Sequence, residues 1–363
     1  MSCQPPQLLS RLRQALGLAA GSSAGPAPGL AEFGWLRNKT ALLIGDAVSR
    51  EHVDNLCQLL GGESEVVRPG HRFAPRPAPP RPAIQASHAL AKPDRLAARG
   101  FKVVKDTARP RMCYIPALDF LAVSTMHFGL DQEDFFHSHQ LPHYSAPGPF
   151  EHRLADLVQP LVAQLRAQGR RSAPDFVELS SGAWDLARWA EQDLATGADP
   201  AAPLGADRVT WYRFRAGQAM DRVRAAFPEA KALTWRTQHY PLSDARERVY
   251  FADKILSPKT EAAAGGASHP PHFAHPRIAQ LDAAVRSLVL PSPASAGSVV
   301  LKAAPHGEFR LNRWGELLKG HEAHQKDRLH GDPLPGGYVW ADVMLYEMRR
   351  GVGRAEARAF RGQ

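Results

Sequence analysis

The chain lacks any apolar run that approaches the roughly 18 residues of a membrane-spanning helix, so no membrane span is visible in the sequence. Its formal net charge of +9 comes mainly from scattered arginines, without a basic stripe, zinc-finger spacing or helix-turn-helix signal. We therefore expect no nucleic-acid partner. The apolar content of 44% is ordinary, and 363 residues are enough for one large domain with a buried core. The sequence leaves the oligomeric state open.

Cysteine is also scarce, and the 3 residues present cannot build the disulfide scaffold of a small secreted domain. Cys3 lies close to the N-terminus, which leaves Cys57 and Cys113 as a candidate disulfide or as two free thiols. Asn38-Lys39-Thr40 forms a glycosylation sequon. A disulfide together with a glycosylated sequon would favour a secretory lumen as the compartment.

Gly, Ala, Ser and Pro are enriched in residues 1–30, and we expect a disordered leader there. Residues 8–20 resemble a signal peptide only weakly, because their apolar part is short and interrupted by glycine. They suit a frayed amphipathic helix better. Proline-rich and glycine-rich stretches at about 71–100 and 257–276 predict loop inserts. We expect the remaining chain, residues 31–363, to form a single domain.

Short apolar segments alternate with amphipathic helical patterns along this domain, without an internal repeat. We expect strands at residues 41–45, 119–128, 175–179, 230–235 and 298–303. We expect helices at residues 53–60, 154–165, 213–227, 278–288 and 339–349, and another that begins after residue 182. This alternation predicts an α/β fold, with three α/β/α layers in which helices cover both faces of a parallel sheet.

Two histidine-rich stretches have spacings that could suggest a metal site. They are His137-x-His139-x₃-His143 and His269-x₂-His272-x₂-His275. Both lie in loop sequence without carboxylate support, so we interpret them as solvated loop histidines. We expect neither a metal nor another cofactor.

The segment from Thr40 to Val53 is the most informative part of the chain, because it lacks one residue that its pattern leads us to expect. An apolar run ends in Gly45-Asp46 and passes directly into an amphipathic helix. In a large class of esterases a nucleophilic serine follows such a Gly-Asp pair, but here the position is Ala47. A methyl group cannot attack a carbonyl carbon, so the frame of a serine hydrolase is present without its nucleophile.

Three further blocks follow this one in order, and together they make the chain resemble the PC-esterase family. The four blocks are Gly45 to Val53, Cys113-Tyr114-Ile115-Pro116 leading to His127-Phe128-Gly129, Ser180-Ser181-Gly182-Ala183-Trp184-Asp185, and Asp327 to Gly336. The family comprises SGNH/GDSL-like acyl-esterases, among them plant and fungal enzymes of polysaccharide O-acetylation. The resemblance runs from about residue 33 to residue 349. It implies an SGNH-hydrolase-like, flavodoxin-like fold.

The resemblance also implies roles for individual residues. Asp327 and His330 match the family's Asp-x-x-His block, in which His acts as the base and Asp orients it. The oxyanion hole would use the backbone N–H of Ala47, with contributions from Gly129 and Ser180. Ser180 stands where the family usually has Asn, which is a second departure from the pattern. Arg236 and His239 lie in a block that resembles one near the family's substrate groove, and they are the candidate substrate-binding residues.

Two departures in separate blocks lead us to expect an acyl-esterase or O-acetyltransferase relative with impaired catalysis. Its substrate would be an acylated polysaccharide or another ester, and the sequence leaves open whether it hydrolyses or transfers the acyl group. One alternative is an active enzyme that uses Ser49, although two residues along a helix rotate a side chain by about 200°. Another is a non-catalytic glycan-binding or scaffolding protein. The family suggests the secretory pathway, the Golgi lumen or the extracellular space, without a clear signal or anchor in this chain.

Overall fold

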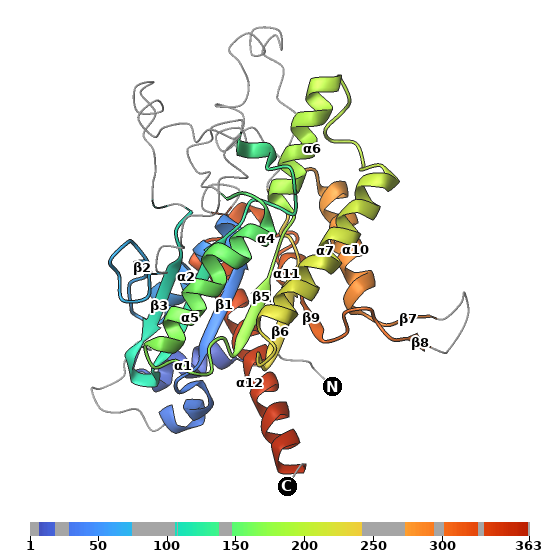
Figure 1. Ribbon diagram of the computed structural model, residues 1–363. Coiled ribbons are helices and arrows are strands. Elements are labelled where there is room, and N and C mark those ends of the chain that lie inside the picture. The colour runs from blue at the N-terminus through green and yellow to red at the C-terminus, as the bar shows by residue number, and fades with distance from the viewer. Residues whose placement is uncertain are drawn as a thin grey trace, which may run out of the picture.

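A seven-stranded sheet forms the centre of the protein, with the strand order β2-β3-β4-β1-β5-β6-β9 (Figure 1). The computed structural model describes residues 7–18, 29–74, 106, 108–137, 147–241, 273–293, 301–325 and 330–361. The strands of this sheet are β1 (Thr40–Gly45), β2 (Glu65–Val66), β3 (Arg111–Ile115), β4 (Phe120–Met126), β5 (Phe176–Leu179), β6 (Ala232–Arg236) and β9 (Phe309–Asn312).

Five of these strands are parallel to their neighbours, in the order β4-β1-β5-β6-β9. Counted along the chain, this is the order 2-1-3-4-5 of a doubly wound sheet. In such a sheet the chain changes direction at the pair formed by the first and third strands, here β1 and β5, and ligands bind beyond the carboxyl ends at this switch point. The expected α/β fold with a mostly parallel sheet is therefore confirmed.

The edge strands differ from the sequence-based expectation. β3 is antiparallel to β4 and β2 is antiparallel to β3, so the sheet is mixed at this edge. The strand expected at 298–303 does not join this sheet. Its described residues Leu301 and Lys302 form β8, which pairs with β7 (Ser292–Pro293) in a separate sheet, and residues 298–300 lie outside the described residues. The fifth parallel strand is β9, whose sequence Phe-Arg-Leu-Asn has too few apolar residues to be recognised as a buried strand.

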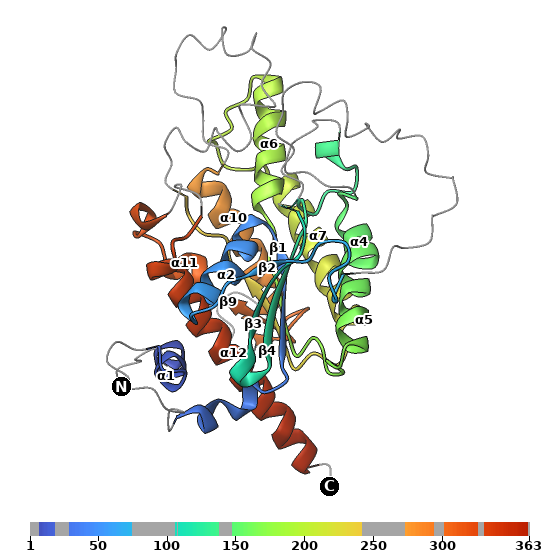
Figure 2. The same ribbon diagram turned by 90° about the vertical axis from the view of Figure 1, so that its left-hand side faces the viewer.

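Helices cover both faces of the sheet, as expected, and Figure 2 shows the sheet between its two layers. The first layer contains α1 (Leu8–Ala15), α2 (Ala47–Leu59) and α12 (Tyr338–Arg361), together with η1 (Leu30–Leu36) and α11 (Trp314–Leu317). The second contains α4 (Phe150–Arg153), η5 (Leu154–Val158), α5 (Gln159–Ala167), α6 (Ala183–Thr196), α7 (Ala206–Ala226) and α10 (His275–Val289). Short helical turns are η3 (Pro116–Leu118), η4 (Phe135–His137), η6 (Glu322–His324) and η7 (Pro333–Gly337).

The central strand β1 supplies side chains to both layers, because successive residues of a strand point to opposite faces. Ala41 and Leu43 pack with α1, α2 and α12, whereas Leu42 and Ile44 pack with the second layer. All four side chains are buried. A strand that is apolar on both faces is typical of a parallel sheet covered by helices.

Residues 8–15 of the expected leader are not disordered, and the amphipathic helix that their pattern favours is confirmed. They form α1, and Leu8, Leu9 and Leu12 are buried in the core that α1 shares with α12. The backbone N–H of Leu9 donates a hydrogen bond to Asp342 Oδ1 at 2.8 Å. Leucines at positions i, i+1 and i+4 give this segment one apolar face, which α12 covers. Residues 1–6 and 19–28 of the leader, and 75–100 and 257–272 of the two inserts, lie outside the described residues.

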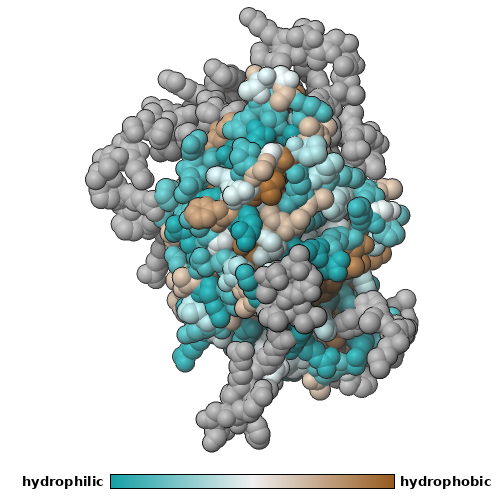
Figure 3. Space-filling model, turned by 90° about the vertical axis from the view of Figure 1, so that its right-hand side faces the viewer, coloured by the Kyte–Doolittle hydropathy of each residue, from teal (hydrophilic) through white to brown (hydrophobic). Residues whose placement is uncertain are grey.

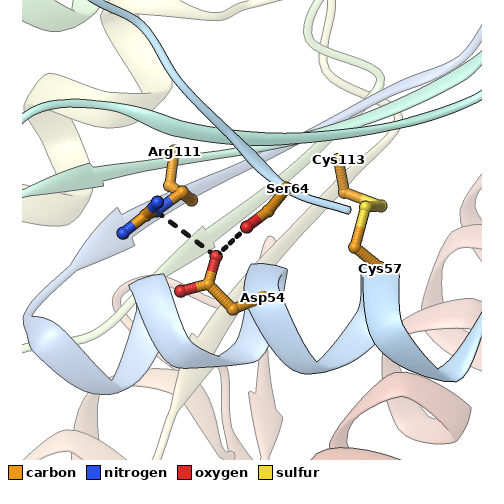
Figure 4. Close-up of a disulfide and its surroundings, with 5 residues drawn as sticks. All are labelled: Asp54, Cys57, Ser64, Arg111 and Cys113. Atoms are coloured by element: carbon orange, nitrogen blue, oxygen red, sulfur yellow. Dashed lines mark hydrogen bonds and ion pairs between the residues drawn. A yellow bond between two sulfur atoms is a disulfide. The ribbon is translucent and has the colours of Figure 1, made fainter. Parts of the chain in front are cut away.

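A disulfide joins Cys57 at the end of α2 to Cys113 on β3, with their Cα atoms 5.4 Å apart (Figure 4). Both residues are buried. One helical turn earlier, Asp54 accepts a hydrogen bond from Ser64 and forms an ion pair with Arg111 of β3, at 3.3 Å. The same face of α2 is thus held to the edge of the sheet by one covalent and two polar contacts.

No helix in the described ranges is both long and apolar enough to span a bilayer.

Candidate active site

Ala47 lies at the switch point, where β1 ends and α2 begins. Asp46 is the N-cap of α2, and its Oδ1 accepts a hydrogen bond from the backbone N–H of Val48 at 2.9 Å. Ala47 is the first residue of the helix, and its N–H is one of the first-turn amides that lack an intrahelical acceptor. With the helix dipole behind it, such an amide suits a developing negative charge.

His127 follows β4 and ties the end of this strand to the end of β5. Its Nε2 lies 2.7 Å from the carbonyl oxygen of Ser180, to which it donates a hydrogen bond, and its Nδ1 lies 3.2 Å from the carbonyl oxygen of Gly129. Burial lowers the pKa of His127, while its two carbonyl partners oppose the shift. The motif His127-Phe128-Gly129 marks this strand end in the sequence, but it does not reveal the role of His127.

Two features of the structure require a glycine at position 129. Its φ of +89° is left-handed, and a Cβ at this position would lie 2.9 Å from Oδ1 of Asp185. Asp185 accepts hydrogen bonds from the backbone N–H of Leu130 at 2.9 Å and from Ser181 Oγ at 3.0 Å. Burial raises the pKa of Asp185 to about 6. The loop after β4 is therefore clamped to the start of α6.

Ser180 lies at the end of β5 and is completely buried. Its Oγ accepts a hydrogen bond from Gln238 Nε2 at 3.1 Å, and the same nitrogen donates to the carbonyl oxygen of Ser181 at 2.8 Å. Both amide hydrogens of Gln238 are used in these two bonds. Gln238 therefore does not replace the oxyanion donor that an Asn at position 180 would supply.

Arg236 requires a correction, because its side chain is fully buried and has no surface with which to contact a substrate. Its Nε donates to Glu178 Oε1 at 3.1 Å, and its Nη2 donates to Ser49 Oγ at 3.1 Å and lies 3.7 Å from Asp46 Oδ1. Arg236 thus holds α2 to β5 and β6 beneath the strand ends. The sequence could not reveal that Arg236 is buried, since an Arg at the end of a strand could equally line a substrate groove.

Ser49, the alternative nucleophile, belongs to the same buried contact. Only 1% of its surface is exposed, and a Cβ on Gly45 would lie 2.1 Å from its Oγ. The hydroxyl therefore points under the end of β1, towards Arg236. The Ser49 hydroxyl is therefore not accessible to an ester carbonyl.

The segment that carries His330 is held against α2 and α11. The carbonyl oxygen of Gly331 accepts a hydrogen bond from Asn55 Nδ2 at 3.1 Å, and that of Gly336 accepts one from Trp314 Nε1 at 2.8 Å. His330 is buried. Its predicted orienting partner, Asp327, lies outside the described residues.

His52 of α2 is a site neighbour that the sequence analysis missed. Its ring stacks on Trp340 and meets Trp314 edge-on, with centroid distances of 4.4 Å in both cases. Burial lowers the pKa of His52 well below its ordinary value, and the nearby Arg236, His239 and His330 lower it further. These groups therefore share one buried region beside the start of α2. No periodicity or motif distinguishes His52 from a core residue of an amphipathic helix.

His239 follows β6, is buried, and has its ring centroid 5.5 Å from that of Trp314. It lies with His52 beside Trp314, although little of its surface is available to a ligand. The substrate-binding role expected for His239 stays a prediction.

Among the described residues, no group of three or more His, Cys, Asp or Glu side chains could hold a metal ion. His275 Nε2 lies 2.8 Å from the carbonyl oxygen of Pro241. His139, His143, His269 and His272 lie outside the described residues.

No protein-family model and no curated protein matches this chain.

Proposed function

We propose that this protein is an SGNH-like relative of the PC-esterase acyl-esterases and acetyltransferases whose catalysis is impaired because its nucleophile is missing. The observation that supports this most strongly is the position of Ala47. It is the first residue of α2, directly after β1, at the switch point of a 2-1-3-4-5 sheet. A serine at this position would carry its hydroxyl at the amino end of the helix, beside the strand ends.

The remaining groups suit acyl transfer. The N–H of Ala47 would stabilise the oxyanion of a tetrahedral intermediate, and His330 would act as the general base with Asp327 to orient it. Without an Oγ at residue 47, no acyl-enzyme forms there. Removal of the nucleophile from a triad enzyme lowers kcat by about 10⁶-fold, so the native chain should be nearly inert.

The substrate class is an acylated polysaccharide or a related ester. A water molecule as acceptor would give hydrolysis, and a sugar hydroxyl would give O-acetylation of a second chain. A chain of this fold without the nucleophile could equally bind an acylated glycan or act as a scaffold without turnover. The displaced nucleophile Ser49 is the weaker alternative, because its hydroxyl is buried against Gly45 and bound by Arg236.

The substitution Ala47→Ser tests this function. We expect wild type to hydrolyse p-nitrophenyl acetate no faster than the buffer blank, and Ala47→Ser to hydrolyse it measurably, because the base and the helix amide are retained. Ala47→Gly, which adds no hydroxyl, serves as the matched control and should stay inert. In Ala47→Ser, a further His330→Ala change should return the rate to the blank.

The rescue should be partial, since Ser180 replaces an expected oxyanion donor whose loss costs about 10²–10³ in rate. Ala47→Ser combined with Ser180→Asn should therefore exceed Ala47→Ser alone. Robust wild-type turnover that survives His330→Ala would contradict the proposal, because the chemistry would then lie elsewhere on the chain.

A further inference from the structure

Asn38 lies in an exposed turn between η1 and β1. The backbone N–H of Lys39 donates a hydrogen bond to the carbonyl oxygen of Leu36 at 3.1 Å. The backbone angles are φ −61° and ψ 130° at Arg37 and φ +55° at Asn38, as in a type II β-turn. The third residue of such a turn must tolerate a positive φ, which Asn does. Asn38 therefore occupies the apex of this turn.

The side chain of Asn38 is free to carry a modification. Asn38 is exposed, and its amide group has no hydrogen-bond partner in the part of the chain that the structure describes. The turn does not require a Thr two residues later, yet Thr40 is there and completes a sequon. It is the one Asn-x-Ser/Thr sequon in the sequence, and such sequons accept N-linked glycans on the surface loops of secreted proteins.

The disulfide between Cys57 and Cys113 indicates the same compartment as the sequon. Disulfides persist in oxidising compartments such as the lumen of the endoplasmic reticulum, and they are rare in the cytosol. N-linked glycans are also attached in that lumen. The two observations are independent, because the sequon is a local sequence pattern and the disulfide is a contact between residues 56 positions apart.

We infer that Asn38 carries one N-linked glycan, which is attached before β1 joins the sheet. In this transfer the amide nitrogen of Asn38 attacks the anomeric carbon of an oligosaccharide linked to a lipid diphosphate. A C–N bond forms and the C–O bond to the diphosphate breaks. The lipid diphosphate leaves with the electron pair of that bond, and one amide proton passes to the transferase. This modification does not depend on the catalysis proposed above.

The burial of Thr40 determines the order of these events. Only 1% of Thr40 is exposed in the folded protein. Its backbone N–H donates to Asp175 Oδ2 at 3.0 Å, and its Oγ1 accepts a hydrogen bond from Arg170 Nη1 at 3.4 Å. The transferase must recognise the hydroxyl of this residue, which is inaccessible once β1 is paired. The glycan is therefore added to the unfolded chain, although Asn38 itself stays exposed after folding.

A glycan on Asn38 lies at the opposite edge of the sheet from the candidate active site. β1 starts at Thr40, and its six residues span about 17 Å before α2 begins at Ala47. Figure 2 shows η1 at the lower end of the sheet. On the face formed by α7 and α10, in the second layer, apolar residues are scattered among hydrophilic ones (Figure 3), which is normal for a protein surface. Neither this face nor the candidate site depends on the glycan.

Peptide mapping of the protein isolated from its own cells tests the site. Cleavage after Glu releases the peptide from Phe33 to Glu51, which contains Asn38. We expect peptide N-glycosidase F in heavy-oxygen water to convert Asn38 into a labelled Asp. Asn55 and Asn312 are the internal controls and should stay unlabelled, because neither has Ser or Thr two positions later. An unmodified Asn38 in this peptide would overturn the inference.

Translation of the full chain behind a cleavable signal sequence, with microsomes present, tests the acceptor residues. Wild type and Thr40→Ser should each gain one glycan that peptide N-glycosidase F removes. Asn38→Gly should gain none and should fold like wild type by circular dichroism, because Gly suits the positive φ of the turn. A wild-type chain without a glycan, or a glycan on Asn38→Gly, would contradict the assignment of Asn38.

The order of events has its own test. The folded, unglycosylated chain purified from bacteria should gain no glycan from an isolated oligosaccharyltransferase and its lipid-linked donor. The peptide from Phe33 to Glu51 is the matched positive control and should be glycosylated under the same conditions. Equal glycosylation of the folded chain and the peptide would show that β1 can pair first, and the inferred order would then be wrong.

Discussion

At the scale of single residues, the ion pair between Arg236 and Glu178 is the most consequential contact of the site. Both side chains are completely buried. Glu178 also accepts hydrogen bonds from Asn312 Nδ2 at 2.8 Å and Trp340 Nε1 at 3.1 Å. Burial raises the pKa of Glu178, while Arg236 and these donors oppose the rise. The pair thus belongs to a buried network that joins three strands to α12 and satisfies both oxygens of Glu178, whereas Nη1 of Arg236 has no partner among the described residues.

We expect Glu178→Gln to lower the free energy of unfolding by about 3 kcal/mol, because it removes the hydrogen-bonded carboxylate of Arg236 from the interior and leaves only Asp46, at 3.7 Å, to offset the buried charge. Urea unfolding measures this change. Glu229→Gln, at a carboxylate with 73% of its side chain exposed, should change stability by less than about 0.5 kcal/mol. Equal effects of the two substitutions would mean that water reaches Arg236.

A second residue with a measurable signature is Asp282 of α10. Its Oδ1 accepts a hydrogen bond from the backbone N–H of Gln238 at 3.1 Å, whereas Oδ2 has no partner among the described residues. Burial raises the pKa of Asp282 from 3.8 to about 7. The folded protein therefore keeps a proton here that the unfolded chain releases at lower pH.

This difference makes stability fall as pH rises from about 4 to about 7 and stay level above that range. Asp282→Asn keeps the acceptor for Gln238 but cannot ionise. Between pH 4.5 and pH 8 we expect its stability relative to wild type to increase by about 3 kcal/mol, at about 1.4 kcal/mol per pH unit. Urea unfolding at both pH values gives this difference. Asp207→Asn, at an exposed position of α7, should show no such trend, and a flat difference for Asp282→Asn would refute the assigned cause.

At the scale of elements, α2 is fixed at both ends. Asp46 caps its start and the Cys57–Cys113 disulfide ties its end to β3. The helix that carries Ala47 is therefore held in register with the strand ends. A disulfide with this separation of 56 residues stabilises mainly by restricting the unfolded chain.

The double substitution Cys57→Ala and Cys113→Ala should lower the free energy of unfolding by about 4 kcal/mol at 25 °C, from the entropy of closing such a loop. Thiol titration in denaturant provides an independent check. Of the 3 cysteines, one should react without reductant and all three after reduction. Three reactive thiols before reduction would show that the disulfide does not form.

The elements also show how far the sequence can be interpreted. The stripe of Val53, Leu56, Cys57 and Leu60 correctly predicted α2, because its period matches the one face that packs on the sheet. The strands β1, β4, β5 and β6 were predicted from their short apolar runs, because the sheet buries both of their faces. β9 was missed because pairing with β6, and not its own composition, makes it a strand.

At the scale of the whole molecule, the rule that strand carboxyl ends meet at one edge predicted correctly that Ala47, Gly129 and Ser180 lie at this edge of the sheet. It could not predict which side chains point into the core. Arg236 is turned inwards by its partner Glu178, and Ser49 by its hydrogen bond from Arg236, and no local pattern connects these residues. Long-range contacts of this kind decide which candidate residues remain accessible.

The central position of β1 gives a further prediction for the whole molecule. Native-state hydrogen exchange should find the slowest amides at Leu42, Leu43 and Ile44, because β1 is paired on both sides and covered on both faces. The amides of the edge strand β2 should exchange much faster. Comparable rates in the two strands would mean that the sheet opens as one unit.

The strand order also constrains how the chain folds during translation. β1 emerges first among the strands, yet its partners begin at Phe120 and Phe176, and Leu9 bonds to Asp342. One edge of this apolar strand must therefore wait, unpaired, until β4 begins about 75 residues later, and the other until β5 begins about 130 residues later. Such late pairing slows folding and exposes the nascent chain to aggregation, so chaperone protection would matter most before β5 leaves the ribosome.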